Sequence, residues 1–287
     1  MASSVQQYID AVAQLHTCGG NSLVSVILFG SAASGAFSAS SDVDLILVLP
    51  NEAALDDRRR LREAVSDLEI THGLRLPASR RKNLLEMFAE HAGGEAHSCF
   101  LCTRDDLMSG DVARVFGLRA VEKLLVDRIV LASVIVSAKT VWGADLLSLI
   151  PLPPLRRLDV FKALFGLAGL TLLSVVAFPV LSDATRYGMG ALKHSLHSCY
   201  FCYHLKTVPL NEEVEFFNSR LGRSKTLLDL LNQRRKYHRS FRFVLRCVPV
   251  LFRLHLQTAL DNRFPRTVAR RDIPGHGSHP GSDLVGS

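Results

Sequence analysis

Hydrophobic residues recur with two different periods in the first part of the chain. Between residues 5 and 15 they return every three or four positions, which predicts an amphipathic helix. The runs 23–29, 43–49 and 98–102 are short and rich in β-branched, aromatic or aliphatic residues, and they predict strands. The first two runs are apolar at consecutive positions, so we expect central strands that are covered on both faces.

Beyond residue 121 the strand pattern fades and helical spacing takes over. We expect helices over about 121–139, 156–178, 184–206, 211–233 and 238–261. The segment Pro151-Leu152-Pro153-Pro154 predicts a boundary or a bend. After Asn262 the chain is rich in Pro, Gly, His and Ser, which is typical of a disordered tail.

These elements predict an α+β fold in three parts. Residues 1–120 form a small mixed sheet flanked by helices, residues 121–262 form an all-α helical domain, and residues 263–287 form the tail. The segment from Ala163 to Leu181 has nineteen residues without a charge, which is long enough to cross a bilayer. A central helix of a bundle is hydrophobic all round for the same reason. We favour burial in the bundle over a membrane span because helices of similar length follow it.

The composition is that of a globular protein, with 48% hydrophobic and 21% charged residues. The formal net charge of +7 favours anionic partners, such as nucleotides, RNA or a lipid surface. The first seven residues lack the basic and apolar regions of a secretory signal, and the six cysteines form no compact framework. We therefore expect a reducing compartment, and the cytoplasm is the default.

Two pairs of cysteines have metal-ligand spacing, Cys99/Cys102 and Cys199/Cys202. Four thiolates can hold zinc. The first pair falls in a predicted strand, where positions i and i+3 point to opposite faces and do not converge on one ion. We therefore favour buried thiols over a metal site.

The most informative stretch joins the first two predicted strands. Gly30-Ser31 follows the first strand, and Asp42-Val43-Asp44 opens the second after ten intervening residues. Alternation along a strand places Asp42 and Asp44 on one face, where two carboxylates repel each other unless a cation lies between them. A divalent metal is the usual answer. Gly30 lets the backbone approach a phosphate closely, and Ser31 offers a hydroxyl and an N–H as donors.

This arrangement resembles the active-site signature of the polymerase-β-like nucleotidyltransferase superfamily, over roughly residues 20–110. The resemblance implies transfer of a nucleoside monophosphate, AMP from ATP in our expectation, to a hydroxyl of an acceptor. It implies two Mg²⁺ ions on Asp42 and Asp44, with the triphosphate at Gly30 and Ser31. The two-domain outline is similar to minimal and aminoglycoside-modifying nucleotidyltransferases, which implies a small-molecule acceptor; the basic charge leaves RNA open.

The family also has a third carboxylate on a later strand, for metal binding or for activation of the acceptor hydroxyl. The predicted strand 98–102 contains no acid, so Glu95 just before it is the candidate, with His97 as a substitute base. Asp105 and Asp106 suit a helix start instead. Lys193 is a candidate contact of the triphosphate from the helical domain, although a lysine more commonly extends to solvent.

Two other interpretations remain for the motif. The same fold can serve a non-catalytic, nucleotide-binding regulatory or antitoxin-like protein. Alternatively, the two aspartates end a solvated strand and Gly30-Ser31 is a plain turn. Loss of magnesium-dependent pyrophosphate release on replacing both aspartates separates catalysis from these alternatives.

Overall fold

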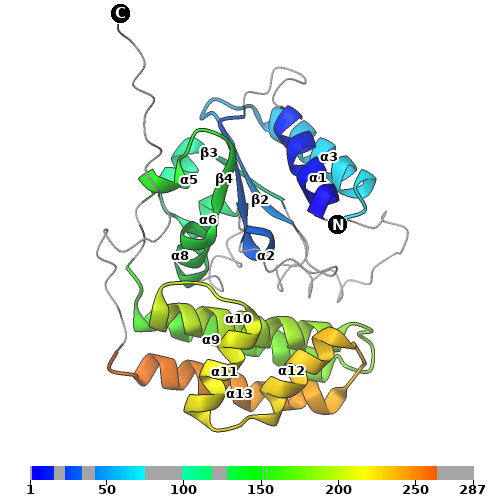
Figure 1. Ribbon diagram of the computed structural model, residues 1–287, viewed down its shortest axis with the longest axis vertical. Helices are drawn as coiled ribbons and strands as arrows, with labels where there is room; N and C mark the ends of the chain where they lie inside the picture. Colours follow the sequence, from blue (N-terminus) through cyan, green and yellow to red (C-terminus); the bar gives the residue numbers. More distant parts are fainter. Residues whose placement is uncertain are drawn as a thin grey trace, which may run out of the picture.

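The computed structural model describes residues 2–15, 23–33, 43–74, 99–117, 128–150, 152 and 154–263. Figure 1 shows two parts: a sheet with helices on both of its faces, and below it a bundle of longer helices. The chain builds the sheet first, and every element from residue 157 onward belongs to the bundle.

The sheet has four strands in the order β3-β2-β1-β4. Their bounds are β1 (Ser25–Phe29), β2 (Asp44–Leu49), β3 (Cys99–Thr103) and β4 (Lys139–Gly143). β1 pairs antiparallel with β2 and β4, whereas β2 pairs parallel with β3. The sheet is therefore mixed, as predicted, and the first two predicted strands are its central ones.

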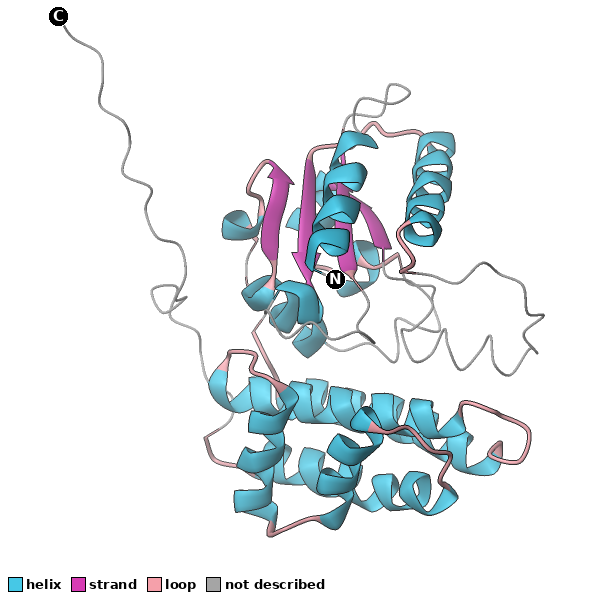
Figure 2. Cartoon of the chain, turned by 45° about the vertical axis from the view of Figure 1, so that its right-hand side comes forward, coloured by secondary structure: helices cyan, strands magenta, loops and turns pink. Residues whose placement is uncertain are grey.

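Both faces of the central strands are buried, which explains why their sequences are apolar at consecutive positions. On one face, alternate residues of β1 and β2 pack with α1 (Ala2–Gln14) and α3 (Leu55–Thr71). On the other face, the intervening residues pack with α5 (Arg104–Met108), α6 (Val112–Val115) and α8 (Arg128–Ser137). Figure 2 shows these two helical layers from another side.

The start of α5 confirms the predicted role of the acidic pair that follows the third strand. The Thr103 Oγ1 atom accepts a hydrogen bond from the Asp106 N–H at 3.1 Å. In return, Asp106 Oδ2 accepts from the Thr103 N–H at 3.1 Å. This reciprocal capping box satisfies two N–H groups that a helix start leaves without an intrahelical acceptor.

The edge strand β4 was missed by the sequence analysis, which assigned residues 121–139 to a helix. The helix α8 ends at Ser137, and β4 begins two residues later at Lys139. Its side chains are alternately exposed and half-buried, so the strand carries little hydrophobic signal. The sheet thus extends past the predicted boundary at residue 120. We propose that the boundary between the domains lies after Gly143.

A short 3₁₀ helix, η2 (Leu147–Leu149), precedes the helical domain. The described part of this domain has five α-helices. They are α9 (Arg157–Val176), α10 (Ala184–His204), α11 (Leu210–Leu221), α12 (Lys225–Arg235) and α13 (Phe241–Leu260). The predicted helix 211–233 is divided in two, because Gly222 has a φ of +73° and ends α11. The Asn218 side chain accepts from the Ser224 N–H at 2.9 Å and fixes the turn.

The central helix of the bundle is α10, which contacts α8, α9, α11, α12 and α13. The prediction that the apolar segment 163–181 is buried all round is therefore wrong in part. α9 packs against α10 and α13 on one side, but Phe165, Leu172 and Val176 are exposed on the other. Among the described residues, α9 and α13 are long and apolar enough to cross a membrane, a test that core helices of soluble proteins also pass.

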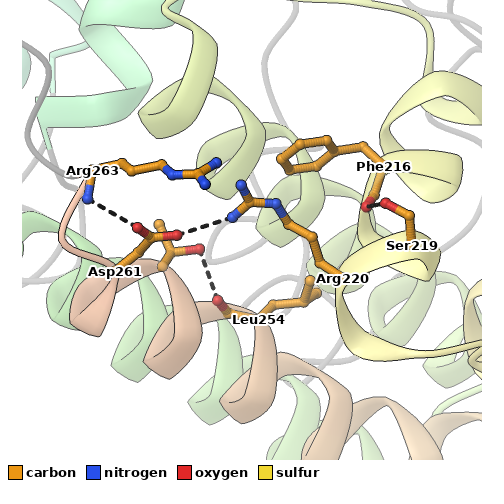
Figure 3. A network of polar contacts seen from close by, with 7 residues as sticks. Phe216, Ser219, Arg220, Leu254, Asp261 and Arg263 are labelled. Carbon is orange, nitrogen blue, oxygen red and sulfur yellow. Dashed lines mark hydrogen bonds and ion pairs between the residues drawn. The ribbon is translucent and has the colours of Figure 1, made fainter.

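A polar network closes the end of the bundle where α11 and α13 meet (Figure 3). Arg220 Nη1 donates to Asp261 Oδ2 at 2.9 Å, and the Arg263 N–H donates to Asp261 Oδ1 at 2.9 Å. The Arg220 guanidinium also lies over the rings of Tyr203 and Phe216, with 4.4 Å and 4.8 Å to their centroids. Arg220 thus connects α11 to α10 and to the residue that follows α13.

Candidate active site

The geometry of the candidate site begins with the pairing of β1 and β2. Because the strands are antiparallel, the last residue of β1 and the first residue of β2 lie side by side at one end of the strands, which we call the site edge of the sheet. Phe29 pairs directly with Asp44, and the short helix α2 (Gly30–Ala33) starts at the next residue. In Figure 1, α2 lies at the end of the sheet that is nearer to the helix bundle.

Gly30 is required at this position for two separate reasons. Its φ is +71°, in the left-handed region that L side chains rarely adopt. A Cβ atom on Gly30 would also collide with the Oδ2 atom of Asp44 and lie 3.4 Å from its Cγ. The Asp44 carboxylate therefore packs directly over the Gly30 backbone. The structure thus brings together the turn and one of the two acids that the sequence linked.

The remaining predicted site residues are described only in part. The Ser31 backbone belongs to α2, but its side chain lies outside the described residues, as do Asp42, Glu95 and His97. By strand alternation, Asp44 shares the face of Ile46 and Val48, which pack toward α5, α6 and α8. Of the predicted catalytic residues Asp42, Asp44 and Glu95, Asp44 is therefore the one that lies within the described ranges.

The donor chemistry at this edge suits a magnesium ion. Asp44 offers carboxylate oxygens, the hard ligands that Mg²⁺ prefers in proteins, and the predicted partner Asp42 would add two more. Within the described ranges, no cluster of three or more His, Cys, Asp or Glu side chains is arranged to hold a metal ion. The Asp44 carboxylate is thus the type of ligand that the predicted Mg²⁺ ion prefers. The second predicted ligand is Asp42.

The cysteine pairs do not converge in the structure. Cys99 contacts the core cluster on the α1 and α3 face of the sheet, whereas Cys102 is buried on the opposite face. Cys199 and Cys202 are buried in two different core clusters of the helical domain. None of these four cysteines is part of a disulfide. Burial raises the pKa of Cys102 to about 12, so this thiol stays protonated and behaves as a small apolar group.

Lys139 is a candidate site residue that the sequence analysis missed. It is the first residue of β4, and it pairs with Leu28, two residues before Gly30. Its exposed side chain lies at the same end of the sheet as Asp44, on the face of its partner Leu28, which is opposite to the face of Asp44. The signal was present in the alternating pattern of Lys139-Thr140-Val141-Trp142, but the apolar helix before it concealed the strand.

The helical domain contributes a second group of ionisable residues on α10 and α11. His197 Nδ1 lies 2.5 Å from Glu213 Oε1, and the Glu213 side chain is only 1% exposed. Burial raises the pKa of Glu213 to about 8, an effect that the Lys193 ammonium partly offsets. Lys193, one turn before His197 on α10, is partly buried, and its charge acts on both members of this pair.

The fold and the Gly30–Asp44 edge together define a nucleotidyltransferase domain. Residues 5–78 match the model of the family described as nucleotidyltransferase domain, and this range contains β1, Gly30, Ser31, Asp42 and Asp44. The N-terminal part of the chain is therefore a nucleotidyltransferase domain of the polymerase-β-like type, and the predicted resemblance is confirmed. The enzyme class that follows is nucleotidyltransferase.

A solved structure extends the likeness to both domains. It is the crystal structure of spectinomycin adenyltransferase AAD(9) from Enterococcus faecialis with ATP and spectinomycin. The TM-score is 0.53 at 10% sequence identity, and the match covers 88% of this chain and 98% of that one. At this identity the match shows a shared fold, an α+β domain followed by a helical domain. Comparison with curated proteins gives no match.

Proposed function

We propose that this enzyme transfers AMP from ATP to a hydroxyl group of a small molecule, with Mg²⁺ as its metal. The proposal is carried by the contact between Gly30 and the Asp44 carboxylate within a nucleotidyltransferase domain. A structural neighbour that holds ATP and spectinomycin supports ATP as donor and a small hydroxylated compound as acceptor. No finding supports RNA as acceptor. A cytoplasmic location is part of the proposal.

The residues of the chain divide the work between phosphate and metal. Gly30 lets the triphosphate approach the backbone at the start of α2, and the Ser31 hydroxyl and N–H are donors to its oxygens. Asp44, with Asp42, would hold the Mg²⁺ ions through carboxylate oxygens. When bound, such ions neutralise charge on the phosphates and orient the attacking and leaving oxygens. Glu95 is our candidate to accept the proton of the acceptor hydroxyl, with His97 as the alternative.

Two lysines outside the Gly30–Asp44 motif are further candidates to bind the triphosphate. Lys139 lies at the same edge of the sheet as Gly30, and Lys193 lies on α10 of the helical domain. Either ammonium can balance part of the negative charge of a triphosphate, because a point charge in a partly desolvated site acts over several ångströms. We propose a phosphate-contacting role for Lys193, as the resemblance implies, and an auxiliary one for Lys139.

The test is a label-transfer screen with the purified protein. Radiolabelled ATP, GTP, CTP and UTP are each incubated with Mg²⁺ and a panel of aminocyclitols, aminoglycosides and other polyols. We expect label from α-phosphate-labelled ATP to appear on one acceptor class, with release of pyrophosphate. Asp44→Asn should slow transfer by about 10²–10³-fold, whereas Asp105→Asn, at an exposed acid after β3, should leave the rate unchanged. Magnesium-dependent binding of ATP without transfer to any acceptor would favour a regulatory protein of the same fold.

A further inference from the structure

The outward sides of α9 and α13 carry large hydrophobic side chains that no described part of the chain covers. On α13 these are Phe241, Leu245, Phe252, Leu256 and Leu260, and on α9 they are Leu158, Phe165, Leu172 and Val176. Phe165 is 68% exposed and Val176 is 79% exposed. Their spacing of four and seven residues makes one stripe along each helix. Exposed apolar residues in a continuous group mark an interaction surface far more often than scattered ones do.

The two stripes lie along neighbouring helices. α9 and α13 pack against each other in opposite directions, because the Phe178 ring just after α9 meets the Phe241 ring at the start of α13 at 5.2 Å. At the other end, His255 Nδ1 lies 3.1 Å from the Val160 carbonyl oxygen. Phe241 takes part both in this contact and in the exposed stripe, so the stripe of α13 borders α9. Each helix has 20 residues and is therefore about 30 Å long.

A row of arginines runs beside the stripe on α13. Arg242, Arg246 and Arg253 are exposed and follow one another at spacings of four and seven residues. α13 contains no acidic residue. The acid of α9, Asp159, is buried and accepts a hydrogen bond from the Arg156 N–H at 2.8 Å, so it caps the helix and does not face outward. The surface formed by the two stripes and these arginines, the α9–α13 face, is thus apolar and purely cationic.

We propose that the α9–α13 face docks on the surface of an anionic lipid bilayer, with both helices lying in the plane of the interface. An amphipathic helix with an apolar stripe beside arginines is the arrangement that inserts its apolar side among acyl chains and pairs its cations with headgroup phosphates. A second copy of the chain is disfavoured as the occupant, because its identical face would bring arginines toward arginines with no exposed acid to pair with them.

The contacts of the two helices exclude a span for this docked state. The opposite side of α13 holds His255, which is buried and lies 3.0 Å from Ser195 Oγ on α10. A membrane-spanning arrangement would break this contact and expose these polar groups to hydrocarbon. The docked enzyme therefore keeps its bundle, and lipid binding does not depend on the proposed transfer reaction.

The experiment is flotation of the full-length protein with vesicles of phosphatidylcholine alone or of phosphatidylcholine mixed with phosphatidylglycerol. We expect binding to the anionic vesicles, weakened at 1 M salt, where charges are screened beyond about 3 Å. Arg242→Gln/Arg246→Gln/Arg253→Gln should reduce the affinity ~100-fold, since each arginine near such a surface contributes about fivefold. Leu245→Ser/Phe252→Ser should reduce it by a comparable factor.

Matched controls remove the same groups from other surfaces. Arg223→Gln/Lys225→Gln/Arg235→Gln takes three exposed charges from α12 and its approach, and Leu55→Ser/Leu228→Ser takes two exposed leucines from α3 and α12. Both should bind like the wild type. Equal binding to neutral and anionic vesicles, or none to either, would overturn the proposal. So would a dimer in light scattering that Leu245→Ser/Phe252→Ser dissociates, because the occupant would then be a second copy. Flotation needs no acceptor, so its result is independent of the transfer assay.

Discussion

The sheet and the helix bundle distribute polar and apolar groups in opposite ways. The central strands bury nearly every side chain, and their polar chemistry lies at one edge, where Asp44 packs over Gly30. The bundle buries polar groups in its interior, among them Glu213, Ser195 and His255, and it exposes leucines and phenylalanines on α9 and α13. Burial is therefore a poor guide to function in the bundle. In the sheet, the proposed site residues lie at the strand ends, whereas the strand bodies form the apolar core.

We expect the largest effect from a substitution of Asp44, at the end of the sheet that carries the proposed active site. Asp44→Asn should lower the rate of magnesium-dependent pyrophosphate release by about 10²–10³-fold, because a neutral amide is a weak ligand for Mg²⁺. The melting temperature should change little, since Asp44 lies outside the apolar core. Steady-state pyrophosphate assays and circular dichroism measure the two quantities. Unchanged turnover in this variant would remove Asp44 from the catalytic set.

Gly30→Ala tests how closely the turn fits the carboxylate. We expect a loss of about 2–4 kcal/mol in the free energy of unfolding, from about 1 kcal/mol of backbone strain plus a collision with Asp44. Gly73→Ala is the matched control: its φ is +70°, and a Cβ there meets nothing within 4 Å. Urea unfolding should show a loss of only about 1 kcal/mol for Gly73→Ala. Equal losses in the two variants would show that the Asp44 side chain moves aside for the added methyl group without a cost in stability.

Arg220→Ala tests a polar network inside the bundle. The variant removes an ion pair to Asp261 and the stacking on Tyr203 and Phe216, and both partners of the pair are about one-fifth exposed. We expect a loss of about 2 kcal/mol in the free energy of unfolding, after allowance for solvent screening. Arg223→Ala, at an exposed position after α11, should cost less than about 0.5 kcal/mol. A cost for Arg220→Ala no larger than this control would mean that the network does not stabilise the fold.

Glu213→Gln gives an effect no larger than that of Arg220→Ala, and it depends on pH. Burial raises the pKa of Glu213 to about 8 in the folded protein from an ordinary value of 4.5, so between these values the unfolded chain binds fewer protons than the native one. Stability should therefore fall as pH rises from 6.5 to 8.5 in the wild type. Glutamine cannot ionise, so the variant should gain about 2 kcal/mol relative to the wild type over this interval. Urea unfolding at both pH values measures it, and parallel pH dependences would show that Glu213 is ionised in the native state.

The sequence predicted the sheet edge better than the rest because its signals are local. β1 and β2 are runs of apolar residues, and a turn glycine and an acid mark their ends. Strand β4 could not be read in the same way, because its alternation spans five half-exposed residues next to an apolar helix. Its pairing with β1 is a contact between residues more than 110 positions apart.

Other features depend on contacts that no local pattern encodes. The segment of α9 was recognised as apolar, but which of its sides is buried depends on α10 and α13. The most enclosed helix, α10, is less apolar than α9, because it meets neighbours on several sides and accommodates His197, Lys193 and Ser195. The pair of His197 and Glu213 joins residues 16 positions apart on two helices, so neither residue could be singled out from sequence spacing.

The direct pairing of Phe29 with Asp44 has a consequence for how this site tolerates change. The β1–β2 ladder fixes both ends of the connection, so residues can be inserted or deleted between them without moving Gly30 relative to Asp44. A single residue inserted within either strand would instead turn Asp44 to the opposite face of the sheet, away from Gly30. The length of the connection can therefore change while the register of five residue pairs keeps the Asp44 carboxylate in place.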